Sequence, residues 1–186
     1  RIWTERSTGT TISPSGIGCF GQHRWVVGDR SASRFTTDGG RTWETYNLSG
    51  ADYPRNMIVE KDGSLLFVRA VKSDWSFKGE GSPNLQLCRS KDGRTWTFTE
   101  GAVDWDFQAF GEVSAIRLKD GRLLAALRRQ IPKTKGEGFE DTVVTESSDG
   151  GKHWSRPRVM VNTAEVHVYL TELHDGRILA TYSNYH

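Results

Sequence analysis

Short apolar runs alternate with polar turns along this chain, and the runs recur at nearly constant intervals. Asp-Gly pairs stand between two such runs at Asp62-Gly63, Asp120-Gly121 and Asp175-Gly176. Successive pairs are 58 residues (62 to 120) and 55 residues (120 to 175) apart. An Asp-Gly pair between apolar runs is a strong β-hairpin signal, and a continuous apolar run after it is typical of a strand buried on both faces. The pattern therefore predicts one such hairpin in each repeat.

A second repeated element ends in tryptophan. Its copies are Thr36-Thr37-Asp38-Gly39-Gly40-Arg41-Thr42-Trp43, Ser90-Lys91-Asp92-Gly93-Arg94-Thr95-Trp96 and Ser147-Ser148-Asp149-Gly150-Gly151-Lys152-His153-Trp154. In each copy the aspartate can accept hydrogen bonds from backbone N–H groups of its own turn, and glycine supplies a positive φ. The tryptophan is expected to fold back as an apolar lid. Each copy thus predicts a tight turn that closes a second hairpin.

The two signals together order the elements within one repeat. A first strand, the Asp-Gly turn, a second strand, a longer polar loop, a third strand, the tryptophan-containing turn and a fourth strand make a four-stranded antiparallel meander. Such sheets repeated radially form a β-propeller, so the predicted fold class is all-β with little or no helix. We expect blades at about 15–50, 54–100 and 110–160, and an incomplete one at 164–186.

The tryptophan-containing turn resembles the Asp-box of sialidases, Ser/Thr-x-Asp-x-Gly-x-Thr-Trp. The third copy has His153 in place of threonine, and the second is one residue short. The resemblance implies that the turn joins the third and fourth strands of a blade and has a structural role. It also implies a six-bladed ring, and three and a half blades do not close one. We therefore expect this chain to be part of a longer propeller.

Composition narrows the function classes. The chain has 186 residues, seven tryptophans, twenty glycines and a net charge of +2. Its acidic and basic residues are interspersed, which gives no argument for nucleic acid, and no apolar run reaches the length of a transmembrane helix. No signal peptide is visible, but the sialidase resemblance implies a secreted or periplasmic location. Two cysteines, Cys19 and Cys88, are expected to be buried thiols, with a disulfide bridge as the alternative.

The meander predicts which end of the sheets carries function. Both kinds of turn lie at one end, so the starts of the first strands, the ends of the second strands and the loops that follow lie at the other. Function concentrates in loops held at one face of a rigid scaffold. Because the first strand of a blade is innermost, Arg55, Glu112 and His167 are expected to ring the central mouth at this end.

The stretch from Gly111 to Arg128 is similar to a sialidase blade with a glutamate at the start of its first strand and an arginine about sixteen residues later. The resemblance implies that Arg128 binds the substrate carboxylate and that Glu112 activates a tyrosine nucleophile. Arginine offers a bidentate fork for a carboxylate, and tyrosine needs a base to become a good nucleophile. Arg129 is the alternative to Arg128, since adjacent strand residues point to opposite faces. A plain salt bridge is the alternative for the pair.

The resemblance extends more loosely to two other residues. Arg55 corresponds to a further substrate-binding arginine, and Asp74, in the loop of the same blade, to the acid/base carboxylate. The family usually has further blades between these residues and the glutamate, whereas here the two blades are adjacent. A subsite residue, a solvated loop or Glu80 as the acid are the alternatives.

His167 is expected to be a hydrogen-bonded residue of the substrate-binding wall, because no partner at metal-ligand spacing accompanies it. Tyr182 is expected in the core. The sequence implies no cofactor, since it has no nucleotide-binding glycine motif. It implies no metal, since no further His or Cys accompanies His167 at ligand spacing.

The predicted function is that of a sialidase-like glycoside hydrolase, an enzyme that removes a terminal sialic acid or a similar acidic sugar from a glycan. Two alternatives remain open. One is another glycan-active hydrolase or lyase built on the same propeller, and the other is a non-catalytic propeller that binds protein or glycan. The nucleophilic tyrosine and the third arginine of the family are expected outside these 186 residues.

Overall fold

The computed structural model of the protein describes residues 16–19, 25–28, 32–47, 56–71, 84–103, 108–131, 139–161 and 165–184. These residues form strands and turns and contain no helix. The strands are β1 (Gly16–Cys19), β2 (Trp25–Gly28), β3 (Ala32–Thr36), β4 (Glu44–Asn47), β5 (Ile58–Val59), β6 (Leu65–Val71), β7 (Asn84–Ser90), β8 (Thr97–Gly101), β9 (Gln108–Arg117), β10 (Leu123–Ile131), β11 (Phe139–Ser147), β12 (Arg158–Val161), β13 (Glu165–Glu172) and β14 (Ile178–Asn184).

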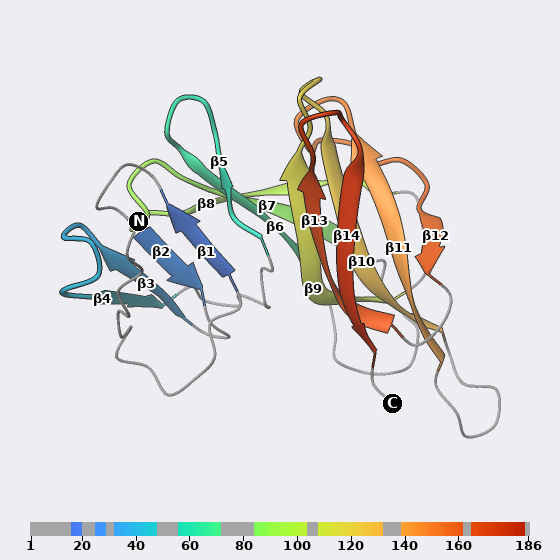
Figure 1. Cartoon of the computed structure of the whole chain (residues 1–186), viewed down its shortest axis with the longest axis horizontal. Coiled ribbons are helices and arrows are strands. Elements are labelled where there is room, and N and C mark those ends of the chain that lie inside the picture. The colour runs from blue at the N-terminus through green and yellow to red at the C-terminus, as the bar shows by residue number, and fades with distance from the viewer. Residues whose placement is uncertain are drawn as a thin grey trace.

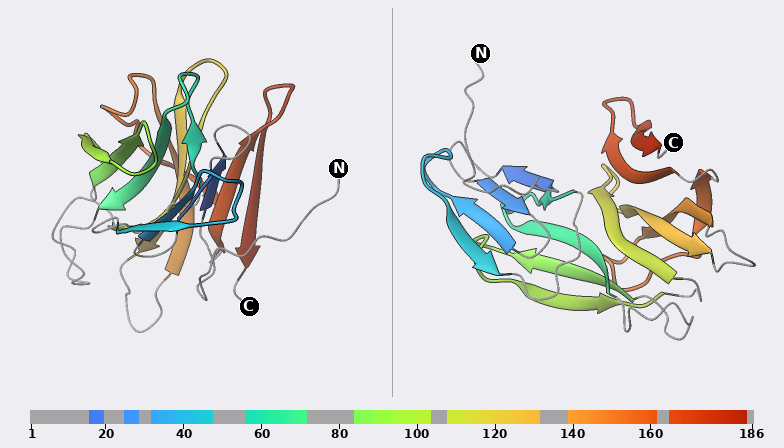
Figure 2. Two further views of the ribbon diagram at one scale, coloured as in Figure 1. Left: turned by 90° about the vertical axis from the view of Figure 1, so that its left-hand side faces the viewer. Right: turned by 90° about the horizontal axis from the view of Figure 1, so that it is seen from below.

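The strands form three four-stranded sheets and one two-stranded sheet, each with its strands in chain order. Every pairing between neighbouring strands is antiparallel. The sheets follow one another in an arc (Figures 1 and 2). The chain is therefore an all-β protein built of propeller blades, and the predicted fold class is confirmed.

The Asp-Gly turns are three-residue hairpin loops. In the first, the N–H of Gly63 donates to the carbonyl of Glu60 at 2.9 Å, and the N–H of Glu60 donates to the carbonyl of Ser64 at 2.8 Å. Gly63 has a φ of 82°, which an L-residue rarely adopts. Asp62 accepts the backbone N–H of Ser64 on its Oδ1 at 2.9 Å. The same bonds recur at 118–122 and 173–177, so the sequence signal located all three turns.

The tryptophan-containing turns, here called the Asp–Trp turns (36–43, 90–96 and 147–154), are closed by their aspartates. Asp38 Oδ1 accepts the backbone N–H groups of Arg41 at 2.9 Å and Thr42 at 3.0 Å. The hydroxyl of Thr36 donates to the same oxygen and accepts the N–H of Gly40 at 3.0 Å. Each carboxylate thus binds the donors of its own turn.

The two irregular copies keep this arrangement. In the shortened turn, Asp92 Oδ1 accepts the N–H groups of Arg94 and Thr95, each at 2.7 Å. In the third turn, His153 Nδ1 lies 2.6 Å from Asp149 Oδ2, in the place where the hydroxyl of Thr42 lies in the first turn. The sequence departures therefore change the partner of the carboxylate but preserve its role.

The core lies between successive sheets. The second strand of each of the two middle blades is buried on both faces: Leu65 to Ala70 in β6 and Leu123 to Leu127 in β10 are all at most 7% exposed. One side of β10 packs on the second sheet and the other on the sheet of β13 and β14. Tyr182 does not join this core, because its side chain is 51% exposed. In the described residues β14 pairs only with β13, so no further strand covers it.

The third Asp–Trp turn docks onto the second sheet. The N–H of Ala102 donates to the carbonyl of Lys152 at 2.7 Å, and the N–H of Trp154 donates to the carbonyl of Ala102 at 3.0 Å. Trp154 is 4% exposed. A Cβ on Gly101 would lie 2.4 Å from the carbonyl oxygen of Gly151 and 2.6 Å from Trp154 Nε1, so only glycine admits this contact.

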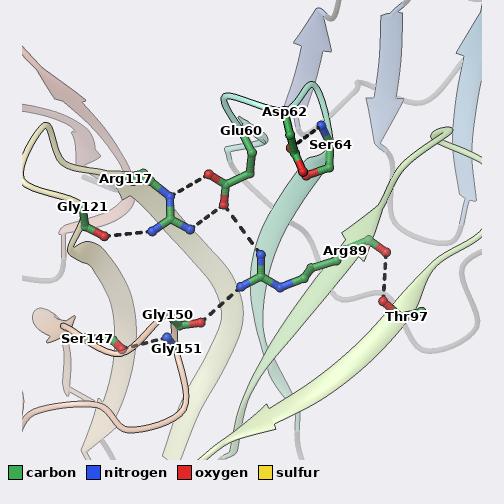
Figure 3. Close-up of polar contacts among 10 residues, drawn as sticks. All are labelled: Glu60, Asp62, Ser64, Arg89, Thr97, Arg117, Gly121, Ser147, Gly150 and Gly151. Atoms are coloured by element: carbon green, nitrogen blue, oxygen red, sulfur yellow. Dashed lines mark hydrogen bonds and ion pairs between the residues drawn. The ribbon is translucent and has the colours of Figure 1, made fainter.

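Ion pairs join neighbouring blades at the turn end of the sheets. Arg117 donates to the carboxylate of Glu60 through Nε at 2.7 Å and also through Nη2. Arg89 lies 3.7 Å from the same carboxylate and donates to the carbonyl of Gly150 at 3.2 Å (Figure 3). Lys119 binds the carbonyl of Leu173 in the last sheet at 2.8 Å. Ion pairs and hydrogen bonds thus join neighbouring blades at the turn end of the sheets.

Replacing Gly101 by alanine should destabilise the protein by about 1–3 kcal/mol, the usual cost of overpacking. The physical reason is the overlap of the new methyl group with Gly151 and Trp154. Chemical unfolding monitored by tryptophan fluorescence measures the change. Glu100→Ala, at the exposed neighbouring position, is the control and should shift the free energy of unfolding by less than about 0.5 kcal/mol. Equal stabilities of the two variants would contradict the close docking.

Acid should weaken the Asp–Trp turns. The backbone N–H of Thr95 is the main reason why the pKa of Asp92 falls from 3.8 to about 2. A carboxylate with a lowered folded-state pKa contributes stability above its unfolded pKa, and that stability is lost as the pH falls through the folded pKa. The free energy of unfolding should therefore decrease between pH 4 and pH 2, and less steeply in Asp92→Asn. Denaturant unfolding at a series of pH values tests this, and parallel curves would refute it.

Candidate functional site

The strand register confirms which segments share the end opposite the turns. Gln130 of β10 lies opposite Gln108 of β9 and Glu140 of β11. The start of the first strand, the end of the second and the start of the third therefore meet at one edge. In the last sheet Glu165 pairs with Asn184 at the same edge. This is the end at which sequence reasoning placed the functional residues.

A β-bulge in the ladder between β9 and β10 places Arg128 opposite the stretch that contains Glu112. Leu127 pairs with Val113 and Arg129 with Ala109, so Arg128 alone faces the stretch 110–112 of β9. Bulges are common beside active sites because they redirect side chains and interrupt the regular ladder. The structure describes the main chain of Glu112, but not its side chain. The predicted pair thus lies at an irregularity of the innermost strand.

A second bulge occupies the same level of the next sheet. Val166 pairs with Ser183 and Tyr169 with Thr181, so His167 and Val168 together face Tyr182. Glu112 and His167 each stand eight residues before the aspartate of their hairpin turn (120 − 112 and 175 − 167). The two predicted residues therefore hold equivalent positions at the starts of adjacent inner strands.

Arg128 and Arg129 belong to opposite faces of β10. Leu123, Ala125 and Leu127 pack toward the second sheet, whereas Leu124 and Ala126 pack toward the last sheet. By the alternation of strand residues, Arg129 continues the first set and Arg128 the second. Arg128 is half-buried and lies opposite Thr142 of β11. Of the two arginines, Arg128 is thus the one on the face of β10 that is turned toward β13.

Arg129 forms a bidentate ion pair with Asp141 of β11. Its Nε donates to Oδ1 at 2.7 Å, and its Nη2 donates to Oδ2. The hydrogen bond to the carboxylate raises the pKa of the guanidinium. Asp141 is 2% exposed, so the pair ties β10 to β11 immediately before the loop that joins them. Sequence reasoning placed Arg129 at the functional end, but did not pair it with Asp141.

Arg69 is likewise engaged within its own blade. Its Nε donates to Gln86 Oε1 at 2.8 Å, and its guanidinium lies 4.9 Å from the centre of the Phe98 ring. The side chain is 6% exposed. Arg69 therefore holds the second blade together at this end and is not offered to solvent.

The other predicted site residues divide into two groups. Arg55 and Asp74 lie outside the described residues. For His167 the structure gives the strand position only.

Asn56, next to Arg55 in sequence, donates to the carbonyl of Leu170 at 3.1 Å. Sequence reasoning overlooked Asn56, although a polar residue recurs at its position in the next blade as Ser114.

The described side chains contain neither a metal-binding cluster nor an exposed thiol. They contain no group of three or more His, Cys, Asp or Glu side chains able to hold a metal ion. Cys88 is free and buried, and burial raises the pKa of its thiol to about 12. It therefore forms no bridge to Cys19 and is protonated at neutral pH.

None of the described segments is a helix that could span a membrane.

No protein-family model and no curated protein matches the chain. Among solved structures, it is similar to a protein of unknown function from Dyadobacter fermentans, with 24% identity and a TM-score of 0.59 over 81% of this chain and 43% of that one. A Hadza microbial sialidase matches with 20% identity and a TM-score of 0.59 over 87% and 39%. An endo-arabinase from Bacteroides thetaiotaomicron matches with 14% identity and a TM-score of 0.55 over 89% and 68%. The chain thus spans less than half of the first two structures, and the likeness establishes the propeller fold.

Removing the Asp141 carboxylate should destabilise the protein through Arg129. Asp141→Ala removes the bidentate carboxylate that binds a partly buried guanidinium, and breaking such a pair typically costs about 3 kcal/mol or more. The control is Arg158→Ala, which removes an ion pair with Glu146. The side chain of Arg158 is 72% exposed, so this change should lower the free energy of unfolding by less than about 1 kcal/mol. Differential scanning calorimetry of the two variants measures the contrast. A loss of thermal stability no larger in Asp141→Ala than in Arg158→Ala would show that the pair of Arg129 and Asp141 does not stabilise the fold.

Proposed function

We propose that the protein is a sialidase-like glycoside hydrolase that removes a terminal sialic acid or a similar acidic sugar from glycans. The observation that carries this proposal is the β-bulge that brings Arg128 opposite the stretch containing Glu112 at the loop-bearing end of the third blade. A carboxylate near the start of the innermost strand and a guanidinium on the strand beside it are suited to an anionic sugar near the propeller axis.

Each residue has a distinct proposed role. Arg128 binds the carboxylate of the sugar, with Arg55 as a second arginine. Glu112 takes the proton from a tyrosine hydroxyl supplied from outside these residues, and the phenolate attacks the anomeric carbon. Asp74 donates a proton to the departing glycosidic oxygen and then activates the water that releases the sugar. Such a tyrosine-dependent mechanism replaces the usual pair of carboxylates.

The two remaining predicted residues take supporting roles in this proposal. His167 belongs to the wall of the site, because its strand position is equivalent to that of Glu112. Arg129 is held by Asp141. It affects the substrate indirectly, because it fixes the position of β10 and of the loop that follows this strand. The mechanism needs no metal and no cofactor.

The fold neighbours support a glycan-active propeller. One carries the name sialidase and another the name endo-arabinase. A charged clamp favours the acidic sugar over the neutral one, since arginine gains most from a carboxylate partner. The endo-arabinase likeness, which covers 68% of that structure, makes hydrolysis of a neutral glycan the second candidate. A glycan substrate also favours a secreted or periplasmic location.

Hydrolysis of a fluorogenic sialoside by the full-length protein tests the proposal. Glu112→Ala and Arg128→Ala should each lower kcat/KM by a factor of about 100 or more, a typical loss for a general base or an electrostatic contact. The control is Arg177→Ala, whose side chain is 78% exposed at a hairpin turn, and it should keep full activity.

The outcomes separate the alternatives. Cleavage that survives both substitutions would retain the enzyme and reject these two residues. Cleavage of an arabinan but not of the sialoside would favour the neutral substrate. An intact protein that hydrolyses neither would point to a non-catalytic propeller, for which glycan binding can be measured directly.

A further inference from the structure

The main chain of Leu170 makes two hydrogen bonds that lead out of its own sheet. Its N–H donates to the hydroxyl of Ser114 at 3.0 Å, and its carbonyl accepts a bond from Asn56 Nδ2 at 3.1 Å. Leu170 lies opposite Ala180 of β14. In an antiparallel ladder, alternate residue pairs exchange no hydrogen bonds, so these two polar groups face away from β14. They lie on the inner edge of the first strand of the last sheet.

The three residues come from three successive sheets. Asn56 precedes β5 of the second sheet, Ser114 lies in β9 of the third, and Leu170 lies in β13 of the last. Asn56 and Ser114 both stand six residues before the aspartate of their hairpin turn (62 − 56 and 120 − 114), and Leu170 stands five before its own (175 − 170). The contact therefore joins three innermost strands at nearly one level.

The hydrogen-bonding groups of this contact are shielded from water, so breaking the contact leaves them without a substitute partner. Ser114 is 0% exposed and Leu170 is 2% exposed, while Asn56 is half-buried. A buried donor or acceptor that loses its partner keeps the full cost of its desolvation. The apolar faces between the sheets tolerate small sliding movements, whereas two hydrogen bonds to the main chain of one residue specify a relative position.

The contact lies directly beneath the candidate site. Ser114 is two residues from Glu112 along β9, which corresponds to about 7 Å of strand. Leu170 is three residues from His167 along β13, and Asn56 follows Arg55 in sequence. Every inner-strand residue of the predicted mouth is thus within three residues of a member of this contact.

We propose that Asn56 and Ser114 are positioning residues, which hold the starts of three inner strands in register through the peptide groups of Leu170. This inference rests on the proposed function, because what they position is the substrate-binding mouth. Glu112 and His167 belong to different sheets with no covalent connection at this level, and Arg55 precedes Asn56 in sequence. An active site needs its groups held to within a fraction of an ångström, and an error of about 1 Å can cost a factor of about 100 in rate.

The test combines hydrogen exchange with kinetics in the full-length protein. Ser114→Ala should accelerate exchange of the Leu170 amide at least tenfold, because that N–H loses its acceptor. Asn56→Ala and the isosteric Asn56→Asp, which both lack the donor, should lower kcat/KM on the fluorogenic sialoside 10- to 100-fold. Ser114→Ala should lower kcat/KM as well, whereas Ser114→Thr, which keeps the hydroxyl, should retain most of the activity. Ser64→Ala, a hydroxyl deletion at the hairpin turn of the second sheet, should change neither measurement.

Asn56 is the decisive position if the Ser114 variants fold poorly, since its half-buried side chain can be shortened without opening the core. Unchanged exchange at Leu170 in a folded Ser114→Ala variant would overturn the contact itself. A kcat/KM within twofold of the unchanged protein in both Asn56 variants would overturn the positioning role. Absence of hydrolysis by the unchanged protein would instead overturn the proposed function, and with it the positioning role, while the exchange data would still report the contact.

Discussion

The structure depends on the burial of the second strand of each middle blade between two neighbouring sheets. The side chains of β6 and β10 pack on both faces, so neither sheet has an independent core, and each needs its neighbours. Area removed from water on two faces supplies the main stabilisation. The same packing constrains the connections, because strands in the centre of such a sheet can be joined only by turns at its two ends. One end is closed by short aspartate-capped turns, and the other is left to longer loops.

The turn end and the loop end use polar groups for different purposes. At the turn end, six aspartates bind the donors of their own turns, and the pKa of each is lowered from its ordinary value. Ion pairs such as that of Glu60 with Arg117 then join one blade to the next. At the loop end, two of the charged groups are satisfied within a blade, as for Arg129 and Arg69, and bulges interrupt the ladders of the inner strands. A rigid closed end and an irregular open end are the arrangement expected of a scaffold that carries a site.

The candidate site follows from this asymmetry. The bulges at Glu112 and His167 stand at equivalent positions of successive blades, so the repeat presents residues of different chemistry at one level. The contact of Asn56 and Ser114 with Leu170 lies just below that level. Residues contributed by separate blades share a site only if the blades keep a fixed relative position, and apolar packing alone does not specify position to a fraction of an ångström.

The sequence by itself determined the all-β fold, the four-stranded meander and the location of the described turns, because these depend on local chemistry: Asp-Gly and Asp–Trp turns, and continuous apolar runs. It also located the end at which Glu112 and Arg128 lie, since the order of strands and turns decides that. Only the tertiary structure decided which face of β10 each arginine occupies, the pairing of Arg129 with Asp141, the exposure of Tyr182 and the contact at Leu170. These depend on strand register, on bulges and on which sheet lies alongside, and such contacts join residues 12, 56 and 114 positions apart that no local pattern connects.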